Sequence, residues 1–217
     1  MIKDLIEHHF ASIVLIGDFN PKIFQPNWFV QNDLIREQEG NDVKDLVIHN
    51  EVVSFNLDWL SIQVTREKIV VLSDHDAYFQ LLYDFVVGTF KLLKHTPIRM
   101  LGINHHIHIR NTKNTNWNEF SSTIAPKKIW EKAFPKGEYE TIVIKEDIEK
   151  YNGFIKMTMQ PSSRIDKGIF FEVNNHFQVK EDDKKKIGCI EIITILENEW
   201  DNVNRNTLQL IETVWNH

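Results

Sequence analysis

Hydrophobic and polar positions follow two different periods along the first half of the chain. Several runs either alternate between apolar and polar residues or are rich in β-branched residues, and polar turn residues separate them. Both patterns predict strands. Over residues 74–95 the apolar side chains instead recur every three or four positions behind Asp74, which predicts a helix. A shorter helix is predicted over residues 26–37. The predicted strands are residues 8–19, 46–57, 60–65, 68–73 and 98–110.

The second half repeats this order of patterns. A short helix is predicted over residues 125–134 and a terminal helix over residues 200–215, and the predicted strands are residues 139–145, 153–160, 168–179 and 187–196. Residues 111–118 are rich in Asn, Thr and Lys, which favours an exposed loop. We therefore expect an α+β fold of two β-meander-plus-helix halves, residues 1–110 and 111–217, in which mostly antiparallel sheet packs against two long helices within one compact domain.

Composition narrows the class of protein. The 217 residues are 42% hydrophobic and 26% charged, which is typical of a globular chain with a real core. The net charge of −6 disfavours binding to nucleic-acid phosphates. Cys189 is the single cysteine, and charged residues interrupt the first positions, where a signal peptide needs an apolar stretch. We expect a cytoplasmic protein that makes no contact with a membrane.

Four segments carry a resemblance to known proteins. They are the apolar opening strand, the meander ending LSIQVTREKIVVLSD, the helix YFQLLYDFVVGTFKLLKH and the strand IRMLGINHHIHI. Together they cover about half of the chain, which resembles a sporadically distributed set of bacterial proteins of unknown function. The resemblance implies an α+β fold and a bacterial cytosolic context. It transfers no active site, and such proteins often have Arg and Tyr where this chain has His105 and His106.

Three of the ten histidines lie within four positions of one predicted strand. Because side chains on a strand alternate between faces, Asn104, His106, His108 and Arg110 are expected on one face. His105 is expected on the other face, together with Ile103, Ile107 and Ile109, as a partly buried core residue. The sequence therefore predicts a polar, histidine-bearing face on this strand.

The spacing of His106 and His108 allows both imidazoles to bind one zinc, iron or manganese ion. Such a site needs a third ligand, and His8 or His9 would supply it if the first strand lay beside this one. The alternative is that the histidines form hydrogen bonds within a polar sheet face. The triplet at residues 74–76 is interpreted as a helix start instead of a metal site, because Asp favours that position.

Other catalytic patterns are missing from the sequence. It has no Gly-x-Ser-x-Gly element and no glycine-rich phosphate loop, and Cys189 lies in an apolar run that favours a buried thiol. The lysines at residues 184–186 follow three acidic residues, so that their field is largely cancelled. Lys127 and Lys128 lie near Trp117 and Trp130, which suits stacking on single-stranded nucleic acid or a nucleotide. The i, i+4 spacing of Trp130 and Phe134 more strongly favours the apolar stripe of a short helix.

These observations favour a non-catalytic protein-binding or assembly module without a cofactor. The resemblance implies that such a module belongs to a cytosolic bacterial system, with defence and toxin–antitoxin systems as the candidates. Tryptophan is enriched at binding hot spots, and the chain has six. The expected binding residues are Asn104, His106, His108, Arg110 and Trp117, and the partner is a protein, with a homodimer left open. The alternative is a metal-dependent hydrolase in which His106 and His108 hold the metal and a carboxylate acts as base.

Overall fold

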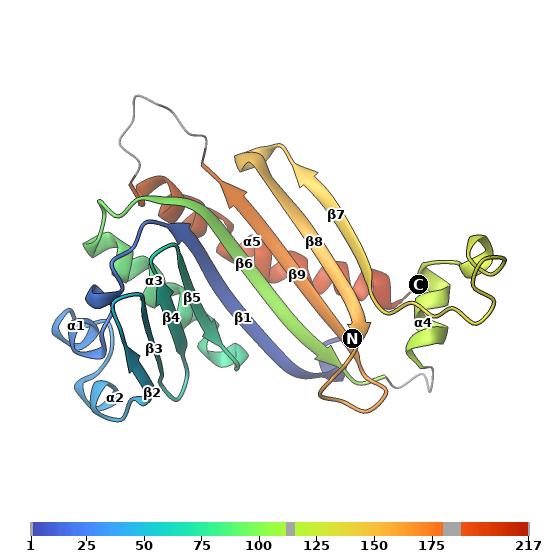
Figure 1. Ribbon diagram of the computed structural model, residues 1–217, viewed down its shortest axis with the longest axis horizontal. Coiled ribbons are helices and arrows are strands. Elements are labelled where there is room, and N and C mark those ends of the chain that lie inside the picture. The colour runs from blue at the N-terminus through green and yellow to red at the C-terminus, as the bar shows by residue number, and fades with distance from the viewer. Residues whose placement is uncertain (1, 112–115, 180–187, 217) are drawn as a thin grey trace.

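A single antiparallel sheet forms the frame of the molecule (Figure 1). The computed structural model describes residues 2–111, 116–179 and 188–216. Within these ranges nine strands pair in the order β2-β3-β4-β5-β1-β6-β9-β8-β7. The strands are β1 (Ile6–Gly17), β2 (Lys44–Ile48), β3 (Val52–Asn56), β4 (Ser61–Thr65), β5 (Lys68–Ser73), β6 (Ile98–Ile109), β7 (Ile142–Ile148), β8 (Gly153–Pro161) and β9 (Ile169–Gln178).

Helices cover one face of this sheet. Those of the described ranges are α1 (Pro26–Gln31), α2 (Glu37–Asn41), α3 (Phe79–Leu92), α4 (Trp117–Ile124) and α5 (Ile190–Trp215), with short 3-10 turns η1 (Ile2–Leu5), η2 (Pro21–Ile23), η3 (Asp76–Tyr78), η4 (Lys127–Ile129) and η5 (Lys150–Asn152). In Figure 1, α3 and α5 lie behind the central strands and no drawn helix lies in front of them. We call this uncovered side the open face. No helix in the described ranges has the length and apolar character needed to cross a membrane.

The core lies between the central strands and these two helices. Ile13 and Leu15 of β1 and Leu101 and Ile103 of β6 are fully buried there. Burial of each such side chain stabilises the fold by about 1.5–3 kcal/mol. A second cluster lies under the carboxyl end of α5, where Trp215 contacts Phe120 of α4. The two longest strands, β1 and β6, therefore both contribute fully buried side chains to the core.

The expected α+β class with a large antiparallel sheet is confirmed. The finer expectation of two halves, each closed by a long helix, is not matched. Only α5, with 26 residues, is long, whereas α3 has 14 residues. One sheet also runs through the whole described chain, because β1 pairs directly with β6. The division into residues 1–110 and 111–217 stays a prediction.

The prediction of a strand over residues 187–196 is wrong. Residue 187 lies outside the described ranges, and α5 begins at Ile190 and continues through the segment predicted as the terminal helix. Ile192, Leu196 and Trp200 are buried at intervals of four residues, which is helical spacing. A run of apolar β-branched residues suits a buried strand and a buried helix equally well, so the run alone could not distinguish them.

Several other helices and strands begin or end at residues different from those predicted. The helix predicted over residues 125–134 is replaced by the earlier α4, whose start is capped by Asn116 and Glu119, followed by the short η4. The loop predicted over residues 111–118 lies partly outside the described ranges, and its last two residues belong to α4. The run at residues 46–57 splits into β2 and β3, and residues 26–37 divide between α1 and the start of α2. His75, not Asp74, caps the turn before α3.

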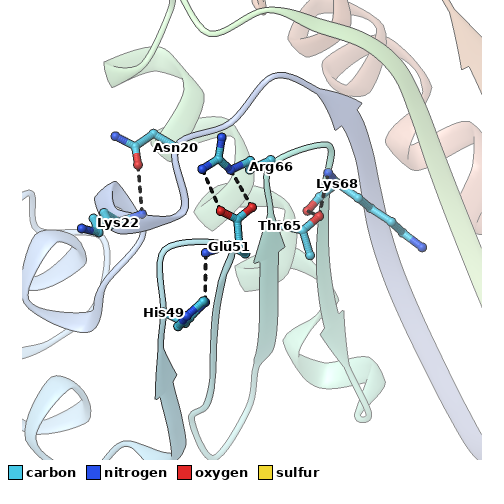
Figure 2. A network of polar contacts seen from close by, with 7 residues as sticks. All are labelled: Asn20, Lys22, His49, Glu51, Thr65, Arg66 and Lys68. Carbon is cyan, nitrogen blue, oxygen red and sulfur yellow. Dashed lines mark hydrogen bonds and ion pairs between the residues drawn. The ribbon is translucent and has the colours of Figure 1, made fainter.

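Polar contacts hold the hairpin turns together at one end of the sheet (Figure 2). The guanidinium of Arg66, in the β4–β5 turn, binds both carboxylate oxygens of Glu51, in the β2–β3 turn, at 2.6 and 2.7 Å. Both side chains are more than half exposed, so this pair contributes less than about 1 kcal/mol. The backbone of the same turn accepts a hydrogen bond from the N–H of Phe19, just after β1.

Candidate functional site

The two central strands bring the histidines of both chain segments together. In the antiparallel register of β1 and β6, His8 lies opposite His108, and Phe10 lies opposite His106. This confirms the adjacency on which a site shared between the two strands depends. The predicted alternation is also confirmed, because His105 packs against Phe79 of α3, whereas His106 and His108 lie on the open face.

Six side chains form a cluster on the open face, which we call the histidine face. The His108 ring lies 4.8 Å from the Phe170 ring and 5.9 Å from the His8 ring, measured between centroids. His106 Nε2 lies 3.8 Å from Glu172 Oε1, and both of these side chains are about one third exposed. The cluster combines residues of β1, β6 and β9, namely His8, Phe10, His106, His108, Phe170 and Glu172.

The loop between β8 and β9 folds onto one end of this cluster. Ser162 Oγ lies 2.8 Å from His108 Nδ1 and accepts hydrogen bonds from the backbone N–H groups of Arg164 and Ile165. The Arg164 guanidinium lies 4.6 Å from the centre of the Phe10 ring. Such a cation–π contact contributes about 0.5–1 kcal/mol at an exposed site. A cationic side chain therefore borders the histidine face.

Burial and neighbouring charges set the protonation of this cluster. Burial lowers the pKa of His108 to about 4, and the positive charge of Arg164 acts in the same direction. The neighbouring His106 imidazole lowers the pKa of the Glu172 carboxyl, which favours its ionised form. At neutral pH this part of the open face therefore combines the uncharged imidazole of His108, the carboxylate of Glu172 and, at its border, the guanidinium of Arg164.

The predicted metal ligands have other neighbours in this structure. His106 faces Glu172, and His108 is hydrogen-bonded to Ser162. Within residues 2–111, 116–179 and 188–216, no three His, Cys, Asp or Glu side chains are placed to hold one metal ion. The third ligand that the sequence argument required is therefore not found among them, and binding of zinc, iron or manganese by His106 and His108 stays a prediction.

The remaining predicted binding residues lie in different surroundings. Asn104 is on the same face of β6 but is buried, and its Nδ2 donates to Ser12 Oγ. Arg110 lies just beyond β6, where its guanidinium is 3.3 Å from Glu7 Oε1. Trp117 does not join the cluster, because it starts α4 and packs in the second core cluster, only 8% exposed. Of the five predicted residues, the open face brings together Asn104, His106 and His108.

A second pair of histidines lies on the covered side of the sheet. His9 Nε2 and His105 Nδ1 are 2.9 Å apart, and both rings contact Phe79. Burial lowers the pKa of His9 to about 4 and that of His105 to about 3. The expectation of His105 as a core residue is confirmed. Cys189 is also buried, with its thiol 3.2 Å from the Phe90 carbonyl oxygen, and burial raises its pKa.

Five residues in or beside the histidine face were not singled out from the sequence: Phe10, Ser162, Arg164, Phe170 and Glu172. The alternation over residues 168–179 did contain a signal, because it places Phe170 and Glu172 on one side of a predicted strand. The alternation does not reveal which strand lies beside residues 168–179. The pairing of β9 with β6 sets Glu172 opposite His106 and Phe170 opposite His108.

Comparison with known proteins gives no further guidance to the site. No family model matches the chain, and no curated protein sequence matches it. The resemblance to sporadically distributed bacterial proteins therefore stays a prediction, and the site is judged from its geometry.

Proposed function

We propose that the chain is a non-catalytic protein-binding or assembly module of the bacterial cytosol, and that it recognises its protein partner through the histidine face. The observation that carries this proposal is the asymmetry of the sheet. One face is covered by α3 and α5, while the open face presents aromatic, imidazole and charged side chains on the two central strands and their neighbour β9.

The composition of the histidine face supports recognition of a protein. Aromatic and arginine side chains are enriched at binding hot spots, and Phe10, Phe170 and Arg164 are grouped here. Long paired strands hold Phe10 and Phe170, so that little conformational freedom of these two side chains is lost when a partner binds. The carboxylate of Glu172 and the guanidinium of Arg164 add polar contacts that would fix the orientation of the partner.

The experiment is affinity purification from the cells that naturally express the chain. The tagged chain is compared with the double variant Phe170→Ala/Arg164→Ala and with a matched control, Leu210→Ala, whose side chain is 38% exposed on α5. We expect a stoichiometric protein partner with the unaltered chain and with the control, and at least about tenfold less of it with the double variant. A partner retained equally by all three chains, or no partner at all, would overturn the proposal. Circular dichroism checks that the variants are folded.

The alternative, a metal-dependent hydrolase, rests on His106 and His108 alone. It is tested on the same purified protein by elemental analysis of the chain and of the His106→Ala/His108→Ala variant. Stoichiometric zinc, iron or manganese that is lost in the variant would favour the hydrolase and count against the binding module. Metal-free protein with an intact partner would favour the binding module.

A further inference from the structure

Two surfaces towards opposite ends of the long axis carry opposite charge, and each exposes apolar side chains. At one end, the segment after α4 projects from the body (Figure 1). Towards the other end, the link between α1 and α2, α2 itself, the β3–β4 turn and the start of α3 line a hollow. We propose that the projecting segment of one copy docks into the hollow of the next, so that the chain self-associates head to tail.

The projecting segment, which we call the tip, consists of residues 126–138. Its apolar side chains are largely uncovered: Ile129 is 80%, Trp130 55% and Phe134 64% exposed. Large apolar side chains grouped on a projection mark an interaction site, since their burial against a partner is favourable. The same residues carry four lysines and two glutamates, so the tip is positively charged within a chain of net charge −6.

The hollow has an apolar floor and an acidic rim. Its volume is about 720 Å³, and Trp59, Leu81 and Phe85 line it, with Leu81 47% exposed. Five carboxylates also line it, against the single cation Arg36 among the lining residues: Asp33, Glu39, Asp42, Asp58 and Asp84. Asp58 is already paired with Lys44, 2.8 Å away, so the other four supply most of the negative charge that faces the hollow. Ligand pockets in proteins have volumes of about 300–1,000 Å³. The volume of the hollow therefore suits the indole ring of Trp130 and the phenyl ring of Phe134.

Charge selects a second copy as the occupant of the hollow. The lysines of the tip meet the carboxylates of the rim, while Trp130 and Phe134 meet the apolar floor. Because the two surfaces lie at opposite ends of one chain, a copy cannot fill its own hollow with its own tip. The contact is therefore heterologous, and repeated use of it adds copies in a row instead of closing a twofold dimer.

Sedimentation velocity over a series of protein concentrations tests this proposal. We expect association at low ionic strength that weakens at least about tenfold near 0.5 M salt, because exposed charges are screened. Two variants should each abolish it: Trp130→Ser/Phe134→Ser in the tip, and Leu81→Lys in the hollow. The matched controls are Leu92→Lys, 51% exposed on the same helix as Leu81, and Ile190→Ser, 65% exposed on α5; both should associate like the unaltered chain.

Mixing the two variants distinguishes this contact from a symmetric one. The tip variant keeps its hollow and the hollow variant keeps its tip, so the mixture should form one-to-one pairs and nothing larger. A monomeric unaltered chain at all concentrations, failure of the mixture to pair, or binding of the tip to anionic lipid vesicles without self-association would each overturn the proposal. The histidine face takes no part in this contact, so loss of its partner leaves the result unaffected.

Discussion

His9 of β1 and His105 of β6 share a hydrogen bond on the covered side of the sheet, with 2.9 Å between Nε2 of the first and Nδ1 of the second. Phe79 of α3 packs against both rings. One imidazole must donate and the other accept, so the pair is compatible with two uncharged rings. Protonation of both rings would place two positive charges side by side in the core.

This pair makes the stability of the fold dependent on pH. Burial lowers the pKa of His9 to about 4 and that of His105 to about 3, whereas both are near 6.5 in the unfolded chain. Between pH 6.5 and these lowered pKa values, His9 and His105 bind protons in the unfolded chain but not in the folded chain. The stabilisation is therefore complete above about pH 7 and is lost as the pH falls through 6.5 towards 3. Urea unfolding at several pH values across this interval measures the loss.

A double variant isolates the contribution of the pair. His9→Phe/His105→Leu removes both buried imidazoles, so the unfolding free energy should fall less steeply below about pH 6.5. Part of the slope of unfolding free energy against pH should remain, because burial also lowers the pKa of His108 to about 4. His49→Gln, at an exposed position, serves as the control and should keep the original slope. A double variant with that same slope would contradict the role of the pair.

The sequence predicted which face each histidine occupies but not which strand lies beside it. Alternation over residues 98–110 is unambiguous, because Ile103, Ile107 and Ile109 must be buried on one side. The contacts of His105 with His9, and of His106 with Glu172, join residues far apart in the chain, and periodicity carries no information on such pairing. The Ile-rich start of α5 was misassigned because its residue types favour strands, whereas packing against the sheet selects a helix.

Two isoleucines of α5 test the corrected assignment directly. In a strand, Ile190 and Ile192 would share a face, but in a helix they point in nearly opposite directions. Ile192 is fully buried and Ile190 is 65% exposed. We expect Ile192→Ala to cost about 2–4 kcal/mol of unfolding free energy and Ile190→Ala less than about 0.5 kcal/mol. Chemical denaturation of both variants checks this, and equal losses would contradict the helix.

Ser162 links the β8–β9 loop to the histidine face. Its hydroxyl oxygen accepts from two backbone N–H groups, those of Arg164 and Ile165, and contacts His108 Nδ1. Ser162→Ala removes these contacts and should cost about 1 kcal/mol. Hydrogen exchange should accelerate at the Arg164 and Ile165 amides, while the amides of β6 stay protected. Ser163→Ala, at the next position of the loop, is the control and should leave both amides unchanged. If exchange at these amides is unaffected by Ser162→Ala, the loop is held by other contacts.

Two glycines in the central strands predict opposite responses to alanine. A Cβ on Gly17, at the end of β1, would lie 2.2 Å from the carbonyl oxygen of Pro97, a backbone atom that cannot move without shifting β6. A Cβ on Gly102, within β6, would meet its nearest atoms, in Asn104 and Val14, at 3.6 Å, which is ordinary contact.

Gly17→Ala should therefore cost about 1–3 kcal/mol, because β1 and β6 must separate at that end. Gly102→Ala should be neutral or stabilise by about 0.5–1 kcal/mol, because alanine loses less backbone entropy than glycine on folding. Thermal unfolding of the two variants gives the comparison, with the unaltered chain as reference. A Gly17→Ala chain as stable as the Gly102→Ala chain would mean that the end of β1 does not approach Pro97 so closely, and hence that the pairing of the two central strands stops short of Gly17.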